Sequence, residues 1–399
     1  MRLKYLVLLL LVPVIAQAND KMIRRLDGTR ISTEAASKLA RQTLAARHVT
    51  GAQIAVVERG RLVWSEAFGM RSLDPPLPME TTTTTWAASI TKSVFATYVM
   101  QLVERGEFDL DLPVARQLPK PLDQYEPFRE TASLLVKDPQ WARVTPRMLL
   151  AHTSGLLNFP FLEPDKKMHL HFAPGSQFFY SGEGINILQF VIEQKKQRPL
   201  EVLMQDALFT PLGMTHTGMV FRKEFESNIA DRFDAAGAFE AKTRRAPARA
   251  AGSMTSSAED LARFASALFE GKILKASTRR KMFEPAIVIR TLHQFPLTAD
   301  EPEGTEGRAV GLAYGAGWGL LTRTRFGPAF FKEGHGDGAQ NFMICFQRRQ
   351  ACMIILTNSD NGELAFRPLL EGILGDTVTP WEWEGYTPGY IAISRKNGN

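Results

Sequence analysis

One segment constrains the fold more than any other, because it has the pattern of a helix that is apolar on most of its sides. It runs from about Ile90 to Arg105, and Gly106 follows as a stop signal. Its apolar residues are Ile90, Val94, Phe95, Tyr98, Val99, Leu102 and Val103. A surface helix needs a polar face, so the sequence predicts that this helix lies inside the protein.

Strand patterns gather toward the two ends of the chain, whereas the middle is mainly helical with long connections. Near the beginning, Gln53 to Val57 and Leu62 to Phe68 predict an antiparallel hairpin. Near the end, strand character returns at Trp318 to Thr324, Phe330 to Glu333, Asn341 to Gln347 and Ala351 to Thr357. We therefore expect an α/β fold of the α+β type. Both chain ends would build one antiparallel sheet flanked by helices, and the middle would be an inserted, mainly helical lobe.

The length of 399 residues fits one folding unit with two lobes. We place this unit at 19–375, with the sheet lobe at about 19–100 and 310–375 and the helical lobe at about 101–309. A C-terminal tail follows at 376–399, and we expect it to pack against the outside of the sheet. Its aromatic residues are Trp381, Trp383, Tyr386 and Tyr390. The cleft between the lobes is the expected place for a site.

The first 18 residues have the pattern of a secretory signal peptide. Arg2 and Lys4 give a positive start, Tyr5 to Ile15 is an apolar run, and Ala16-Gln17-Ala18 is a small-residue cleavage site. A membrane anchor is the alternative, but the run is shorter than the roughly 20 residues that span a bilayer. We expect export to a periplasm or out of the cell, with no stable membrane anchor after cleavage.

The charge of the chain argues against a nucleic-acid partner. Cleavage would take Arg2 and Lys4 from the formal net charge of +6 and leave +4, which is mild. The densest basic stretch, from Lys242 to Arg249, contains no aromatic residue on which a base could stack. We interpret this stretch as a solvated loop.

The chain has two cysteines, Cys345 and Cys352, so it does not depend on a disulfide framework. They lie on the two strands of the last predicted hairpin, with a turn near Arg348 and Arg349 that would place them opposite each other. One disulfide and two buried free thiols both fit this placement.

The only Ser-x-x-Lys in the chain is Ser89-Ile90-Thr91-Lys92, at the start of the apolar helix. Free backbone N–H groups and the helix dipole favour developing negative charge there, and Lys92 lies one turn on, on the same side. A lysine in a low-dielectric cleft can be neutral enough to take the proton of a serine hydroxyl. A structural N-cap serine with a surface lysine is the alternative.

Two further segments carry residues suited to catalysis. Tyr180-Ser181-Gly182 precedes a predicted helix, where a nearby cation would favour the phenolate of Tyr180 for proton shuttling. A core tyrosine is the alternative. The glycine-rich run from Glu333 to Gly338 ends an apolar strand, and a backbone N–H there can face the carbonyl oxygen of a substrate. A glycine-rich hairpin turn is the alternative.

These three elements, in this order, resemble the serine β-lactamase and penicillin-binding protein superfamily, and most closely its class C β-lactamase and esterase-like branch. The likeness extends from about Gly51 to Gly375. Supporting segments are Leu149 to Leu156, Pro174 to Ser181, Pro211 to Met214, Ala251 to Ser256 and Leu356 to Asn358. The resemblance implies a β-lactamase and transpeptidase-like fold.

The resemblance also implies roles for individual residues. Ser89 would be the nucleophile that forms an acyl-enzyme, Lys92 its activating partner and Tyr180 the proton relay. His335 would take the place of the family's third-motif lysine or histidine. The backbone N–H groups of Ser89 and Gly338 would form the oxyanion hole.

Two positions depart from the family pattern, because Gly182 stands where the second motif usually has Asn and Asp337 where the third usually has Gly. Gly182, Gly336 and Asp337 are therefore expected to shape substrate binding. Asp337 beside His335 would leave no net positive charge for a substrate carboxylate, and Gly182 lacks an amide side chain, so neutral short-chain esters are the expected preference. The alternative is that Asp337 turns outward and never meets the substrate.

The function expected from these residues is that of an exported serine hydrolase, an esterase or amidase acting on small substrates without metal or organic cofactor. A D-amino-acid peptidase or DD-carboxypeptidase acting on cell-wall peptides is the second interpretation, and a β-lactamase is the third. From another class, a catalytically silent protein would use the cleft only to bind a cell-wall peptide.

Competing catalytic patterns are weak. The chain contains neither Gly-x-Ser-x-Gly nor a Walker-type phosphate loop. His169-Leu170-His171 resembles a metal-binding pair but lacks the aspartate of a metallo-hydrolase, so we interpret both as surface histidines. For His152 we expect a structural hydrogen bond.

Overall fold

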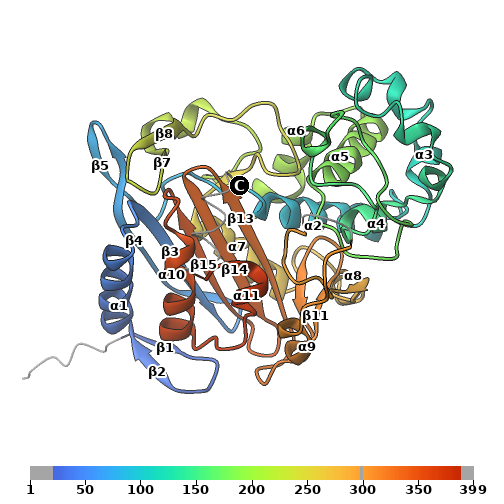
Figure 1. Cartoon of the computed structure of the whole chain (residues 1–399). Helices are drawn as coiled ribbons and strands as arrows, with labels where there is room; N and C mark the ends of the chain where they lie inside the picture. Colours follow the sequence, from blue (N-terminus) through green and yellow to red (C-terminus); the bar gives the residue numbers. More distant parts are fainter. Residues whose placement is uncertain (1–20, 297–299, 388–399) are drawn as a thin grey trace, which may run out of the picture.

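Nine antiparallel strands form one sheet at the centre of the computed structural model, which describes residues 21–296 and 300–387 (Figure 1). In their order across the sheet, these strands are β10 (Ile287–Val288), β11 (Leu312–Tyr314), β12 (Gly319–Leu321), β13 (Ala329–Gly336), β14 (Ala339–Phe346), β15 (Ala351–Thr357), β3 (Gly51–Glu58), β4 (Arg61–Leu73) and β5 (Pro76–Pro78). Strand β15, late in the chain, pairs with β3, near its beginning. Both chain ends therefore build one sheet, as the sequence predicts.

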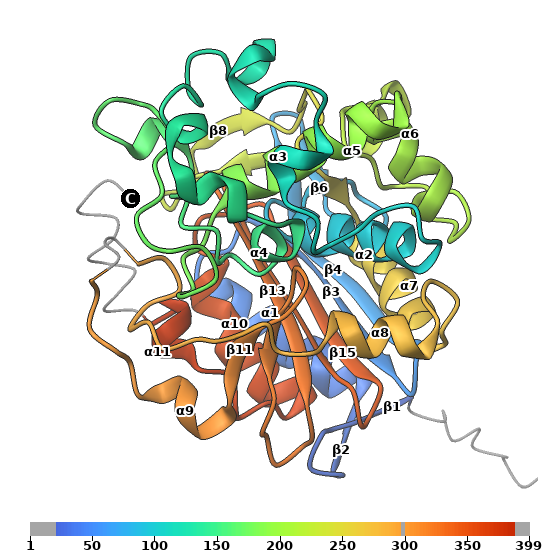
Figure 2. The ribbon, with the colours of Figure 1, turned by 90° about the vertical axis from the view of Figure 1, so that its right-hand side faces the viewer.

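Helices and short strand pairs surround this sheet (Figure 2). The α-helices are α1 (Thr33–Ala46), α2 (Ile90–Glu104), α3 (Val114–Gln117), α4 (Pro146–Leu150), α5 (Gly182–Lys196), α6 (Leu200–Met204), α7 (Ala258–Phe269), α8 (Ala276–Met282), α9 (Glu306–Val310), α10 (Glu363–Leu369) and α11 (Trp381–Glu384). The short strands are β1 (Met22–Arg24) with β2 (Arg30–Ser32), β6 (Thr85–Trp86) with β9 (Thr255–Ser256), and β7 (Asp231–Phe233) with β8 (Phe239–Lys242). Single turns of 3₁₀ or π helix are η1 (Leu122–Gln124), η2 (Glu126–Phe128), η3 (Leu135–Lys137), η4 (Pro139–Arg143), η5 (Pro160–Leu162), η6 (Gln205–Phe209), η7 (Lys223–Asn228) and η8 (Leu370–Leu374).

The predicted leader, residues 1–18, lies outside the described residues, as does Tyr390 of the tail. Within residues 21–296 and 300–387, no helix has both the length and the apolar character needed to cross a membrane.

Strand β3 shows how the sheet separates two cores. Ala52, Ile54 and Val56 face one core, and Ala55 and Val57 face the other, because successive side chains of a strand point to opposite sides. Helices α1 and α10 cover the first face, and α7 covers the second (Figure 1). The sheet therefore lies between two helical layers.

Helix α2 is buried, as its apolar pattern predicts. Twelve of its 15 residues are buried, and it packs against β13 and β14 and against α8. Figure 1 shows α2 between the sheet and the helices that follow it in the chain. The N-terminus of α2 therefore lies where these two parts of the molecule meet.

Helices α3 to α6 and their connecting turns form a mainly helical lobe beside one end of the sheet (Figures 1 and 2). The small β7–β8 sheet follows these helices in the chain. The chain returns to the main sheet at β10, so strands begin earlier than the expected residue 310.

The C-terminal tail packs against the sheet, as expected. Trp381 and Trp383 lie on α11, and both are buried together with Tyr386. The ring centroids of Trp381 and Phe342 are 5.6 Å apart, and those of Trp383 and Phe331 are 6.2 Å apart. The tail therefore completes the core on the outer face of β13 and β14.

The two cysteines face each other across the last hairpin. Cys345 on β14 is the register partner of Cys352 on β15, and the structure joins them by a disulfide. The structure therefore contains the disulfide rather than two buried free thiols.

Candidate active site

Ser89 lies at the N-terminus of α2, in a segment held on both sides. The backbone N–H of Ala87 donates to the carbonyl of Met254 at 2.9 Å, and Asn341 Nδ2 donates to the carbonyl of Trp86 at 3.0 Å. Ala88 has a φ of 46°, which turns the chain sharply into the helix. Among the described residues, no hydrogen bond occupies the backbone N–H of Ser89, so this donor is free to bind a ligand.

Strand β13 passes very close to Ser89 at Gly334. A Cβ on Gly334 would lie 2.4 Å from the carbonyl oxygen of Ala87 and 3.3 Å from the backbone nitrogen of Ser89. A larger residue would therefore push the strand away. Glycine at this position lets the edge of the sheet form one wall of the site.

Lys92 is positioned to act as the base for Ser89. Its Nζ lies 2.9 Å from Oγ of Ser89 and donates to the carbonyl of Ala251 at 2.6 Å. The side chain is buried, and this burial, reinforced by the positive charge of Lys332, holds the pKa of Lys92 well below its ordinary value. A lysine with a lowered pKa has a larger neutral fraction, and a neutral amine can accept the proton of a serine hydroxyl.

Tyr180 lies beside both groups, at the end of the segment that leads into α5. Its hydroxyl accepts a hydrogen bond of 3.1 Å from Nζ of Lys332. Burial and the negative charge of Glu333 raise the pKa of Tyr180 well above its ordinary value, while hydrogen bonding to Ser89 opposes the shift. The expected phenolate is therefore not favoured. Tyr180 keeps its proton and is suited to donate it.

Sequence reasoning missed Lys332, which occupies the place expected for His335. The Lys332 side chain is fully buried on β13, forms an ion pair with Glu333 and contacts the Tyr180 hydroxyl. The signal was present in the chain, because Lys332 and Gly334 have the Lys-x-Gly spacing of the family's third motif. The sequence analysis instead aligned the motif three residues later, with His335 at the lysine position and Asp337 at the glycine position.

His335 lies three residues further along, on the wall of the site. Its Nδ1 is 2.5 Å from Oε1 of Glu363, and its Nε2 is 2.5 Å from the hydroxyl of Tyr386. Burial lowers the pKa of His335, but the charge and hydrogen bond of Glu363 outweigh it, so this pKa is raised. The negative partner of His335 is therefore Glu363 rather than the expected Asp337.

The structure contradicts the roles expected for the three residues that follow His335. Gly336 packs against Trp86, whose ring would lie 2.0 Å from a Cβ at that position, and it does not line the pocket. Asp337 is exposed at the hairpin turn, which matches the outward-turning alternative. The backbone N–H of Gly338 donates to Oδ1 of Asp360 at 2.6 Å, so it is not available as an oxyanion donor.

Gly182 does not leave the gap that the sequence suggested. A Cβ on Gly182 would lie 2.6 Å from the ring of Phe159 and 2.9 Å from Oδ1 of Asn158. The backbone N–H of Gly182 donates to that Oδ1 at 2.8 Å, and Asn158 lines the pocket. An amide is therefore present, and it comes from Asn158.

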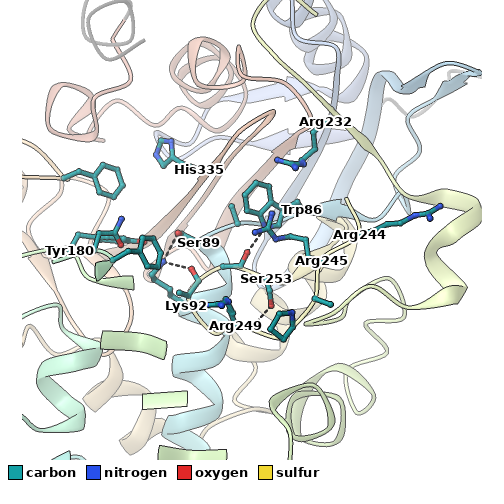
Figure 3. A pocket seen from close by; sticks show the side chains of 18 of the residues that line it. Trp86, Ser89, Lys92, Tyr180, Arg232, Arg244, Arg245, Arg249, Ser253 and His335 are labelled. Atoms are coloured by element: carbon teal, nitrogen blue, oxygen red, sulfur yellow. Dashed lines mark hydrogen bonds between the residues drawn. The ribbon is translucent and has the colours of Figure 1, made fainter. Parts of the chain in front are cut away.

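A pocket of about 490 Å³ opens over Ser89 (Figure 3). Ser89, Lys92, Tyr180 and His335 line it together with Asn158 and Phe159. The opposite wall consists of Trp86, Arg232 and the basic stretch Lys242 to Arg249, which the sequence analysis interpreted as a solvated loop. Neutral esters are therefore no longer the expected preference, because the cleft has basic side chains other than His335.

The three other histidines singled out in the sequence, His152, His169 and His171, have structural partners. Nδ1 of His152 accepts a hydrogen bond of 3.2 Å from the backbone N–H of Ser181, as expected. Nε2 of His169 lies 3.0 Å from Oδ2 of Asp165, and Nε2 of His171 lies 2.7 Å from Oε1 of Glu163. In the described parts of the chain, no three His, Cys, Asp or Glu side chains are grouped so that they could hold a metal ion.

The Beta-lactamase family model matches residues 36–374 of this chain. The chain is 31% identical over 227 residues to "Esterase EstB" of Burkholderia gladioli, covering 49% of this chain and 55% of that protein. It is 26% identical over 244 residues to the putative penicillin-binding protein PbpX of Bacillus subtilis (strain 168), covering 58% of each. The chain thus spans little more than half the length of these two relatives.

Solved structures share the fold. The octameric penicillin-binding protein homologue from Pyrococcus abyssi superimposes with a TM-score of 0.69 at 22% identity, covering 89% of this chain and 79% of that one. The D-amino acid amidase from Ochrobactrum anthropi SV3 gives a TM-score of 0.64 at 23% identity, covering 91% and 99%. These similarities confirm the expected architecture.

The first prediction concerns the pH at which Ser89 becomes reactive. The rate of Ser89 modification by a fluorophosphonate should rise with pH as Lys92 loses its proton. In Lys332→Met this rise should occur at higher pH, because the charge that lowers the pKa of Lys92 is gone while Glu333, which raises it, remains. Rates measured across pH for both proteins test this.

His335→Gln is the matched control, because the charges that act on Lys92 are those of Lys332 and Glu333. Its pH profile should keep the position of the wild type. Lys332→Met leaves Glu333 buried without its partner, which costs about 3–5 kcal/mol. Lys332→Met/Glu333→Gln removes that problem and should still shift the profile upward, since Lys332 has the larger effect on Lys92. A profile unchanged in both folded variants would contradict the assignment.

Proposed function

The chain belongs to the β-lactamase family, and we propose that it is a serine hydrolase that cleaves small esters or amides through an acyl-enzyme on Ser89. One observation carries this proposal. Oγ of Ser89 lies 2.9 Å from the amine of a buried lysine whose pKa is held low, beside a protonated tyrosine. This is the arrangement that activates a serine hydroxyl as a nucleophile.

In the acylation step, Lys92 takes the hydroxyl proton of Ser89 while Oγ attacks the carbonyl carbon of the substrate. Tyr180 gives its proton to the oxygen or nitrogen that leaves, and it regains a proton from Lys92. Lys332 orients the Tyr180 hydroxyl through its hydrogen bond. In the second step, water attacks the acyl-enzyme, and its proton returns to Oγ of Ser89 by the reverse route.

The negative charge that develops on the carbonyl oxygen needs two N–H donors. The first is the free backbone N–H of Ser89. The second follows from the register of β13, because Gly336 and Ala339 flank a two-residue turn and so exchange hydrogen bonds. Successive backbone N–H groups of a strand point to opposite edges, so the N–H of His335 points away from β14. It points to the other edge of β13, where pairing with β12 ends at Phe331. We infer that the backbone of His335 replaces that of Gly338 in the oxyanion hole.

Within the family we favour an esterase or amidase, an activity that fits names found among the matched proteins alongside penicillin-binding proteins. The matched proteins include one named as an esterase and one named as a D-amino acid amidase. The same acylation chemistry can cleave peptides or β-lactams. Assays with ester, peptide and β-lactam substrates distinguish these activities. A protein that only binds cell-wall peptides would not need a neutral lysine beside its serine.

The second prediction is that a fluorophosphonate labels Ser89 and that Ser89→Ala abolishes both labelling and ester hydrolysis. Mass spectrometry of the labelled protein locates the adduct. Ser253→Ala is the matched control, because Ser253 lines the same pocket but its hydroxyl donates to the carbonyl of Met219 rather than facing a lysine. An adduct on another serine, or a folded protein that hydrolyses no ester or amide and is not labelled, would refute the proposal.

We also propose that the protein is exported and cleaved after Ala18. The disulfide between Cys345 and Cys352 supports an oxidising compartment. The third prediction is therefore a mature chain that begins at Asn19 in the periplasm or the medium. N-terminal sequencing of the fractionated protein tests this, and an intact Met1 in a cytoplasmic fraction would contradict it.

A further inference from the structure

The wall of the pocket opposite Tyr180 is strongly basic. Figure 3 shows Tyr180 on one side of Ser89 and the basic side chains on the other, around Trp86. This wall has five basic residues: Arg232, Lys242, Arg244, Arg245 and Arg249. Among the described residues that line it, none is Asp or Glu. A neutral substrate would give these charges nothing to bind.

Two of these arginines are fixed on the indole of Trp86. Cζ of Arg245 lies 3.9 Å from the ring centroid, and Cζ of Arg232 lies 4.9 Å from it. Trp86 itself is held by the hydrogen bond from its Nε1 to the carbonyl of Gly252 at 2.6 Å. Stacking on an immobile ring places both guanidinium groups with little rotational freedom. This is a prepared binding surface rather than a set of mobile surface cations.

Within the described part of the chain, neither Arg232 nor Arg245 forms an ion pair, although the negative charge of Asp337 acts on both. No ion pair or side-chain hydrogen bond of Arg245 occurs in the described part of the chain, whereas its neighbour Arg244 pairs with Glu226. Arg232 donates to the backbone carbonyl of Asp337, and its Nε is buried without a partner. Burial lowers the pKa of Arg245 and the like charge of Arg232 lowers it further, while the negative charge of Asp337 opposes the shift without reversing it. An anion between the two groups would relieve this repulsion.

The catalytic geometry indicates which part of a substrate reaches this surface. Tyr180 protonates the leaving group in the proposed mechanism, so the leaving group lies on the Tyr180 side of Ser89. The acyl part then extends the other way, toward Trp86, which is three residues before Ser89 in the chain. The arginines therefore face the far end of the acyl group.

We propose that the preferred substrates are half-esters or half-amides of dicarboxylic acids, whose free carboxylate binds between Arg232 and Arg245. This inference rests on the proposed function and names its substrate class. Guanidinium groups bind carboxylates through paired, charge-assisted hydrogen bonds. This preference for anionic substrates is the reverse of the preference for neutral esters that the sequence predicted. That prediction assumed that Asp337 pairs with His335, whereas the structure pairs His335 with Glu363.

The fourth prediction compares two esters that differ in one charge. The 4-nitrophenyl half-ester of adipic acid should have a kcat/KM about 10- to 100-fold above that of the same compound with its free carboxylate methylated, the range expected for charge-assisted hydrogen bonds. In Arg245→Gln and in Arg232→Gln the ratio of the two values should fall about tenfold. Arg222→Gln, an arginine of the same region outside the pocket lining, should keep the wild-type ratio.

A second pair of esters tests the position of the carboxylate. Phenyl butyrate and the butyrate ester of 4-hydroxybenzoate differ by a carboxylate on the leaving group, and the anionic member should gain no advantage. The proposal would be overturned if the kcat/KM ratio of the two adipate esters were near one in the wild type, or if both arginine variants left it unchanged. A larger gain from the carboxylate on the leaving group would overturn it as well.

A binding measurement separates this inference from the proposed function. Calorimetry with Ser89→Ala should show that monomethyl adipate binds about tenfold or more tightly than dimethyl adipate, which has the same chain and no free carboxylate. Adding Arg245→Gln should remove the difference. This result requires no turnover, so it holds or fails whether or not any ester is cleaved. Equal affinity for the two esters would refute the anion site alone.

Discussion

Burial of two lysines beside one serine is the constraint on which the rest of the site depends. Lys92 and Lys332 are both buried, and the charge of Lys332 disfavours the positive charge of Lys92. Water would stabilise an ammonium group, so excluding it lowers the pKa of both side chains. Glu333 compensates Lys332 through an ion pair, whereas Lys92 has no such partner among the described residues. The uncompensated lysine is therefore the one that can act as a base.

The fold supplies this enclosure from segments far apart in the chain. The apolar sides of α2 bury its first turn, so that Lys92 cannot reach solvent. The glycine at position 334 lets β13 approach that turn, and the strand brings Lys332 to Tyr180. The aromatic tail from α11 then closes the outer face of β13. The sheet and the buried helix are thus as necessary for the chemistry as the reacting groups.

Sequence predicted the parts that depend on local patterns. The buried helix, the sheet shared by both chain ends and the grouping of Ser89, Lys92 and Tyr180 all follow from spacing and from the family resemblance. The register of β13 could not be predicted in this way, because two stretches that resemble the third motif overlap there. The close approach of Gly334 to Ser89 and the hydrogen bond from Lys332 to Tyr180 identify the correct one. The basic stretch was misinterpreted because the ring on which Arg245 stacks, Trp86, lies far away in the sequence.

The protonation state of Lys92 is the central claim of this account. It is measured most directly by NMR titration of the protein with lysines labelled with ¹³C at Cε, in which the resonance missing from Lys92→Arg identifies Lys92. We predict that Lys92 titrates well below the value of about 10.4 that is usual for lysine. A Lys92 resonance that titrates at or above about 10.4 would contradict a lysine that acts as a neutral base.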